Sequence, residues 1–371
     1  MADAGLPGAI CTSPPIRLSS QSPPMTTDRS PLLLAGAVPS RGDGREQVSW
    51  RRELAEAIRD PGELCRILGL DESLAAAARL AAGGFPLLVP RAFLARMVPG
   101  DPLDPLLLQV LPRPAERATV PGWGPDPLEE SAAMAAPGLV KKYQGRALLL
   151  VTGGCAVNCR YCFRREFPYA EHGAGAAGVD AGIAAIAADP SIREVILSGG
   201  DPLLLDDDRL ADIVYRIMAI PTVRRLRIHT RLPVVLPSRV TPRLVALLAG
   251  LPQPAVVVLH ANHAAELAND VAEAVRALGA SRALLLNQAV LLAAVNDSVP
   301  VLASLSERLL EIGVLPYYLH LPDRVAGTAH FEVAESAAIA LHAGLREVVP
   351  GYAVPRLVRE VPGEPAKVWI G

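Results

Sequence analysis

The stretch ALLLVTGGCAVNCRYCFRREF (residues 147–167) is the starting point for predicting the fold. Its first five residues are apolar and are followed by the β-branched Thr152, which predicts a buried strand over 147–152. A loop with two glycines and three cysteines, Cys155, Cys159 and Cys162, follows this strand directly. In α/β proteins, loops that carry functional side chains gather at the carboxyl ends of parallel strands. The stretch therefore predicts an α/β fold with a candidate site just after its first core strand.

The alternation of strand and helix continues along the chain. Further apolar, strand-like runs lie at 194–198, 225–229, 255–260, 282–288 and 315–321. Helical patterns lie near 178–188, 207–219, 241–249, 264–279, 299–313 and 331–348. Six strand–helix units in succession predict a parallel sheet, and both an open barrel and a doubly wound sheet fit. The polar residues at the predicted strand ends are Thr152, Ser198, His229, His260, Asn287, Gln288 and His320.

The remaining segments differ in composition. Residues 1–45 are rich in Pro, Ser and Gly, which predicts a disordered tail. Residues 46–135 predict a helical and irregular region, with Ser49 capping the first helix and Pro61 starting the second. We expect residues 136–350 to form the α/β core and residues 351–371 to form a separate C-terminal segment.

Composition excludes several classes of protein. The 371 residues carry a formal net charge of −2, so nothing in the charge balance calls for nucleic acid or an anionic membrane. No apolar run reaches the roughly 20 residues of a membrane span, and no secretory signal pattern is present at the N-terminus. We expect a cytoplasmic protein. Its five cysteines, an odd number, argue against a disulfide framework.

The three clustered cysteines have the spacing C-x3-C-x2-C. Three thiolates on one short loop can hold three corners of a cubane iron–sulfur cluster and leave the fourth iron open to a small molecule. A structural zinc site completed by a histidine such as His172 is the alternative, but a second cysteine or histidine pair of the usual spacing is missing.

Two further features point to ligands. The segment Ser198–Asp201 (SGGD) follows the second core strand, and it is either a plain tight turn or a place where a ligand approaches the backbone. Lys367 is one of only three lysines, and apolar residues follow it directly. This pattern favours a docked tail over a solvated one, and a desolvated lysine can form an imine with pyridoxal phosphate.

The motifs together resemble the radical S-adenosylmethionine (SAM) lysine 2,3-aminomutase family. The segments that carry the likeness are GGCAVNCRYCFRR, LSGGDPLLL, LHANHAAEL, NQAVLLAAVND, PYYLHLPDRVAGTAHF and GEPAK. The closer resemblance is to the bacterial subgroup that supplies β-lysine for modifying elongation factor P. This resemblance implies a partial (β/α)6 TIM-type barrel with an N-terminal helical extension and a docked C-terminal tail.

The resemblance also implies cofactor sites. Cys155, Cys159 and Cys162 would bind a [4Fe–4S] cluster whose open iron binds SAM, and Lys367 would hold pyridoxal 5'-phosphate. The residues that would contact the cofactors are Lys142, Tyr143 and Arg146 for pyridoxal phosphate, Ser198, Gly199, Gly200 and Asp201 for SAM, and His260 and Gln288 for the adenosyl and pyridoxal sites. A charged strand entry for residues 142–146 and a buried strand cap for His260 are the structural alternatives.

The implied reaction is the isomerisation of L-lysine to β-lysine, with electrons from a flavodoxin or ferredoxin. Arg164 would pair with the substrate carboxylate and Asp323 with the side-chain ammonium. Glu360 stands where better-known members carry a second aspartate, which leaves substrate positioning open. A surface arginine and a loop aspartate are the plainer interpretations of Arg164 and Asp323. An aminomutase for another amino acid such as glutamate, a radical enzyme without pyridoxal phosphate, and a non-catalytic cluster- or metal-binding protein are the alternative functions.

One departure from the family pattern concerns zinc. Better-known clostridial-type members carry zinc-binding cysteines, one of them after the VND segment and others beyond the pyridoxal lysine. Here Ser298 follows Asn296 and Asp297, and no cysteine lies beyond Cys162. We expect no zinc, and an oligomer, if one forms, that is assembled differently.

Overall fold

The computed structural model describes residues 44–371, with side chains from Ser49 onward. Cys11 and nearly all of the tail predicted for residues 1–45 lie outside the described residues. The first helix, α1 (Gly44–Ala55), already includes Gly44 and Arg45. Ser49 therefore lies inside this helix, where its hydroxyl is 3.4 Å from a carboxylate oxygen of Glu53. The predicted cap at Ser49 is wrong, because the good helix formers Arg45, Glu46 and Gln47 extend the helix upstream.

One open sheet organises the described residues, and its strands follow one another in chain order. The strands are β1 (Met134–Ala136), β2 (Leu139–Val140), β3 (Arg146–Thr152), β4 (Glu194–Gly199), β5 (Arg225–Thr230), β6 (Val256–Leu259), β7 (Leu284–Val290), β8 (Leu315–His320), β9 (Arg356–Arg359) and β10 (Val368–Trp369). Strands β3 to β9 pair in parallel, while β1, β2 and β10 add antiparallel edges. Because the two edges do not pair with each other, the sheet forms a partial barrel rather than a closed one.

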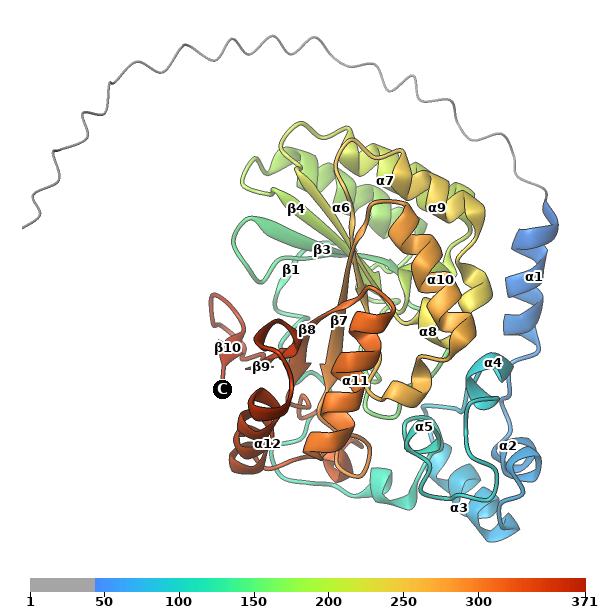
Figure 1. Ribbon diagram of the computed structural model, residues 1–371. Helices are drawn as coiled ribbons and strands as arrows, with labels where there is room; N and C mark the ends of the chain where they lie inside the picture. Colours follow the sequence, from blue (N-terminus) through green and yellow to red (C-terminus); the bar gives the residue numbers. More distant parts are fainter. Residues whose placement is uncertain (1–43) are drawn as a thin grey trace, which may run out of the picture. The chain divides into compact units, whose positions relative to one another are not determined.

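The six predicted strand–helix units are confirmed. The helices that follow the core strands are α6 (Ala176–Ala188), α7 (Asp207–Met218), α9 (Pro242–Ala249), α10 (Asn269–Ala280), α11 (Val299–Glu311) and α12 (Glu335–Val348). They lie around the outside of the curved sheet (Figure 1). Strand β4 is buried along its whole length, as a strand covered on both faces should be. The inner side of the sheet is therefore left for the candidate site.

Short helices and loops precede the sheet. They are α2 (Pro61–Leu68), α3 (Glu72–Ala82), α4 (Arg91–Leu94), α5 (Pro105–Leu108) and the 3₁₀ turn η1 (Pro114–Arg117). Asp60 caps α2 by accepting a hydrogen bond from the backbone of Glu63, and Pro61 occupies the first turn as predicted. All described residues belong to one compact unit, so the boundaries 46–135, 136–350 and 351–371 stay a prediction about segments within it.

The C-terminal tail docks as an edge hairpin. Strand β10 pairs with β9 with Val368 opposite Arg359, and the backbone of Ile370 donates a hydrogen bond to Leu357. Gly363, with φ of 81°, allows the turn between the two strands. The docked tail is thus confirmed. Within residues 44–371, none of the helices has the length and apolar character to cross a membrane.

Candidate active site

A cavity of about 410 Å³ lies on the inner side of the sheet. It is lined by the cysteine loop, which follows the end of β3, and also by Arg146, the first residue of β3. At a rise of about 3.3 Å per residue, this strand spans roughly 20 Å, so the cavity extends along most of it. The sequence-predicted site residues all line the cavity: Lys142, Tyr143, Arg146, Cys155, Cys159, Cys162, Arg164, Ser198, Gly199, Gly200, Asp201, His260, Gln288, Asp323, Glu360 and Lys367.

The N-terminal region holds the cysteine loop in place. Arg160, between two of the cysteines, is fully buried, and its guanidinium forms an ion pair with Glu116 of η1. It also donates a hydrogen bond of 2.7 Å to the carbonyl of Phe85. The backbone of Asn158 bonds to Leu88 at 3.1 Å. The loop is therefore fixed by residues more than forty positions upstream, a contribution that the spacing of its cysteines does not reveal.

Burial raises the pKa of two of the clustered cysteines. It raises the pKa of Cys155 well above its usual value and that of Cys162 to about 11. Since a cysteine binds a metal as its thiolate, any metal bound here would have to displace these protons. Within residues 49–371 no three His, Cys, Asp or Glu side chains converge on a single ion, and His172 bonds to Ser131 instead. A cubane cluster does not require the three thiolates to meet at one ion, because each thiolate binds a different iron of the cluster.

The SGGD segment packs directly on the cysteine loop. The backbone of Gly200 bonds to Thr152, and that of Asp201 bonds to Gly154, both at 2.8 Å. A Cβ on Gly200 would collide with the carbonyl oxygen of Gly154. We expected these glycines to let a ligand approach the backbone; the cysteine loop packs against Gly200, and both glycines also line the cavity. Glycine is required at position 200 because two backbones meet there.

Asp201 holds loops rather than pointing a free carboxylate into the cavity. It accepts hydrogen bonds from the hydroxyl of Thr230 and the backbone of Arg231, both at 2.7 Å. The backbones of Leu203 and Leu232 also donate to it, at 3.0 and 3.1 Å. Burial raises the pKa of Asp201 to about 6. Its oxygens are thus engaged by protein donors that fix the ends of β4 and β5.

A chain of ion pairs crosses the cavity wall from Arg164 to Lys367. The guanidinium of Arg164 binds both oxygens of Glu130, at 2.6 and 2.9 Å. Lys142 lies 3.0 Å from Glu130 and 2.8 Å from Glu360, which in turn pairs with Lys367. Burial disfavours the charge of Glu130, but the cations Arg164 and Lys142 outweigh it and lower its pKa. Sequence reasoning missed Glu130, because it lies in a loop with no motif around it.

The hairpin register explains the spacing of Glu360 and Lys367. Arg359 pairs with Val368 in the hairpin. One residue closer to the turn, Glu360 and Lys367 therefore face each other. The ammonium of Lys367 also lies 5.9 Å from the ring centroid of Tyr318. The docked tail thus places the partly buried amine of Lys367 at the cavity.

Asp323 is the unpaired acid of the site. Its carboxylate has no hydrogen-bond or ion-pair partner among the described residues, although it lines the same cavity as Lys367. Burial and the negative charge of Glu360 raise the pKa of Asp323 to about 7. A carboxylate held in this way is suited to receive a cation from outside the protein.

Three histidines line the cavity. The ring nitrogen Nε2 of His260 lies 2.8 Å from the hydroxyl of Tyr161, and burial lowers the pKa of His260 to about 3. His229 and His320 each carry a buried Nε2 with no partner among the described residues. Sequence reasoning placed these two only at strand ends. Unpartnered buried polar atoms are costly, so they indicate a group that would complete the site.

Several cations lie near the beginnings of the strands. The guanidinium of Arg146 stacks 5.0 Å from the ring centroid of Tyr143. Arg227 pairs with Glu194 at 2.7 Å, and Arg356 completes the group. Arg227 and Arg356 were not predicted as site residues. Guanidinium groups next to a cavity suit phosphate binding.

Comparisons with known proteins place this chain among its relatives. The family model described as "Radical SAM superfamily" matches residues 149–283. The chain is similar to L-lysine 2,3-aminomutase of Escherichia coli, at 47% identity over 89% of this chain and 94% of that one. It is also similar to the L-lysine 2,3-aminomutase of Haemophilus influenzae, at 44% identity over 87% of this chain and 96% of that one.

Among solved structures, SuiB of Streptococcus suis aligns with a TM-score of 0.46 and 13% identity, over 59% of this chain and 50% of that one. The two aminomutases each match this chain along nearly their whole length. The chain therefore belongs to the L-lysine 2,3-aminomutase family of radical SAM proteins.

Proposed function

We propose that the chain is an isomerase that converts L-lysine to β-lysine with a [4Fe–4S] cluster, SAM and pyridoxal 5'-phosphate. The observation that carries the proposal is one cavity that holds three cysteines, an amine and an unpaired carboxylate. When bound, the cluster and SAM supply a carbon radical that abstracts hydrogen, and pyridoxal phosphate supplies an electron sink. The chain itself supplies binding, orientation and exclusion of water.

The cavity residues fit these groups. Cys155, Cys159 and Cys162 would bind three irons of the cluster. Ser198, Gly199, Gly200, His260 and Gln288 would surround SAM and the ring of pyridoxal phosphate, and the orphaned Nε2 atoms of His229 and His320 favour a polar ligand beside them. Asp201 would act indirectly, by holding the loops around SAM.

Lys367 would hold pyridoxal phosphate through its Nζ, with Glu360 fixing that amine. Lys142, Tyr143 and Arg146 would contact the phosphate and ring, and Arg227 and Arg356 add positive charge on the same side. This arrangement suits a phosphate at the beginnings of the strands and a cluster at their ends.

The charges of the cavity favour lysine over glutamate as substrate. Arg164 would bind the substrate carboxylate through its Nη1, which now donates to Ser198 at 3.0 Å, while Glu130 keeps the other side of the guanidinium. Asp323 and Glu360 would meet the side-chain ammonium. The side-chain carboxylate of glutamate would instead face these two acids, an unfavourable approach of like charges.

Cofactor binding tests the proposal before turnover. Protein purified anaerobically should carry iron, show broad absorption in the blue, and contain no stoichiometric zinc. After addition of pyridoxal phosphate and borohydride, mass mapping should place the reduced adduct on Lys367, while the Lys367→Arg variant carries none. A colourless zinc protein, or an adduct on Lys142 or Lys141 instead, would contradict the proposed cofactor sites.

We also propose a cellular role, on the strength of the subgroup resemblance. The product would serve the modification of elongation factor P, a flavodoxin or ferredoxin would supply electrons, and both would meet the enzyme in the cytoplasm. Deleting the gene should remove the β-lysyl mass from elongation factor P, and external β-lysine should restore it. An unchanged mass in the deletion strain would reject this role while leaving the isomerase reaction untouched.

A further inference from the structure

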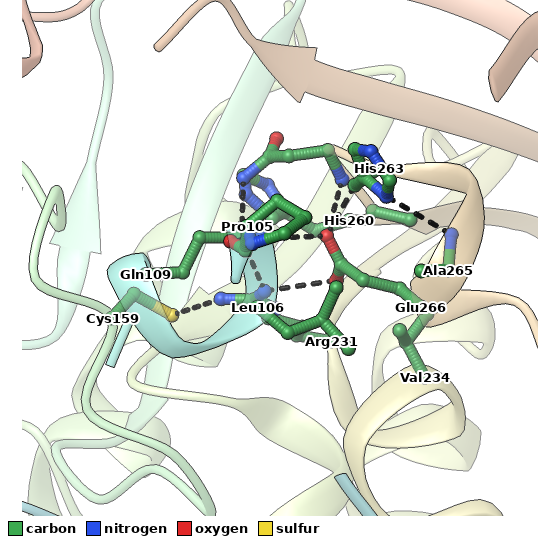
Figure 2. Close-up of polar contacts among 12 residues, drawn as sticks. Pro105, Leu106, Gln109, Cys159, Arg231, Val234, His260, His263, Ala265 and Glu266 are labelled. Atoms are coloured by element: carbon green, nitrogen blue, oxygen red, sulfur yellow. Dashed lines mark hydrogen bonds and ion pairs between the residues drawn. The ribbon is translucent and has the colours of Figure 1, made fainter. Parts of the chain in front are cut away.

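A buried arginine that no sequence motif marks touches one of the cluster cysteines. The guanidinium of Arg231 donates a hydrogen bond of 2.7 Å from Nη1 to the sulfur of Cys159, as Figure 2 shows. Arg231 follows directly after β5 and is 6% exposed. Its guanidinium lies 5.4 Å from the ring centroid of Phe93 and 5.5 Å from that of Tyr161. A charged group kept among aromatic rings needs strong partners to offset the loss of water.

Two buried groups aim the guanidinium at the sulfur. Nη2 of Arg231 donates to Glu266 at 2.9 Å and to Gln109 at 2.8 Å (Figure 2). Glu266 and Gln109 are both fully buried. The backbone of Arg231 is fixed in addition by its bond to Asp201. Both ends of the residue are therefore held, and the remaining side of the guanidinium faces Cys159.

Glu266 and Gln109 are themselves held by a network that leaves little freedom. Glu266 accepts hydrogen bonds from the backbones of Asn262 and His263, at 2.8 and 3.1 Å, and from Gln109 at 3.1 Å. Gln109 also accepts a bond of 3.0 Å from the side chain of Asn262. Gln109 lies at the end of α5, outside the segment 149–283 that the radical SAM model matches. The N-terminal region thus takes part in orienting a cation at the cysteine loop.

We propose that Arg231 is a positioning residue that raises the reduction potential of the cluster through Cys159, and that Glu266 limits this effect. The inference rests on the cluster of the proposed function. A hydrogen bond to a ligating sulfur and a nearby positive charge both stabilise the more negative, reduced state of a cluster. In a water-poor site these effects are strong, because little solvent screens them. The buried carboxylate of Glu266 acts in the opposite direction.

The test is an EPR-monitored potentiometric titration of the reconstituted full-length protein, without SAM. Removing the cation in Arg231→Met should move the midpoint potential of the cluster to a more negative value. Arg231→Lys, which keeps the charge but not the fork of donors, should shift it less. Glu266→Gln, which removes the opposing charge, should move the potential to a more positive value. Arg227→Met is the matched control, since Arg227 lines the same cavity but pairs with Glu194.

Opposite shifts in the Arg231 and Glu266 variants, with a smaller shift in Arg227→Met, support the proposal. Shifts of the same sign, or an Arg231→Met shift no larger than that of the control, overturn it, because a purely packing role would disturb both variants alike. If Arg231→Met binds less iron than the wild type, the potential shifts of Arg231→Lys and Glu266→Gln are compared instead. Shifts of opposite sign support the proposal, and shifts of the same sign overturn it. Failure of the wild type to bind a cluster would instead reject the proposed function and this inference with it.

Discussion

Replacing Asp323 with asparagine should stabilise the protein, and the gain should grow with pH. Burial and Glu360 raise the pKa of Asp323 from 3.8 to about 7. Below about pH 4 this acid is protonated in both the folded and the unfolded chain, so it does not lower the free energy of unfolding. Between about pH 4 and 7 only the unfolded chain ionises, and stability falls as the pH rises. Above about pH 7 the folded protein carries the full cost of the buried charge.

The size of the effect follows from the two pKa values. Their separation corresponds to about 4 kcal/mol, which is an upper bound. Because the side chain borders a cavity that admits solvent, screening reduces the expected gain to about 2 kcal/mol at pH 8. For a chain of 371 residues, that is a rise in melting temperature of roughly 2–4 °C. Added L-lysine should reduce the difference in melting temperature between Asp323→Asn and the wild type. Its ammonium would stabilise the charged carboxylate, which only the wild type carries.

Thermal unfolding at pH 5 and pH 8, with and without lysine, measures this difference. The control is Asp297→Asn, which removes the same charge from an exposed position. We expect Asp323→Asn to exceed the control at pH 8 by more than it does at pH 5. An equal gain at both pH values would refute the argument that a buried, unpaired carboxylate is held ready for a cation.

Two further substitutions test the supports of the site. Glu130→Gln should lower the free energy of unfolding by about 3 kcal/mol, because the buried charges of Arg164 and Lys142 lose their shared partner. Chemical denaturation measures this change, and an unchanged denaturation midpoint would contradict the chain of ion pairs. Gly200→Ala should reduce the iron bound per chain, since its Cβ would push the cysteine loop away, whereas Gly84→Ala, which meets open space, should not. Equal iron in both would contradict the packing argument.

The parallel core could be predicted from sequence for a physical reason. Strands β3 to β8 are four to seven residues long and are each followed by a helix; most are largely apolar, and β5 (RLRIHT) alternates polar and apolar residues, so their pattern is local. Strands β1, β2, β9 and β10 are only two to four residues long, too short to show a hydrophobic pattern of their own. The hairpin that brings Lys367 to Glu360 could be anticipated only as a docked tail.

The sequence predicted the candidate site residues that lie in short motifs. It missed the residues that only tertiary contacts bring to the site. The cysteines and Lys367 stand out by spacing and by rarity. Glu130 lies 34 residues from the arginine that it binds, and Arg231 reaches a cysteine 72 residues away. No periodicity links such pairs, so only the fold reveals that these charges are neighbours. The same is true of the glycine at position 200, whose need arises from another loop.

Product formation tests the central claim most directly. Reconstituted protein would be incubated anaerobically with dithionite, SAM, pyridoxal phosphate and either L-lysine or L-glutamate, and the amino acids separated by chromatography with mass detection. The account predicts β-lysine from lysine, loss of that product when any cofactor is omitted or in Cys159→Ser, and little or no β-glutamate. Full loading with iron and pyridoxal phosphate but no β-lysine, or a preference for glutamate, would contradict the account.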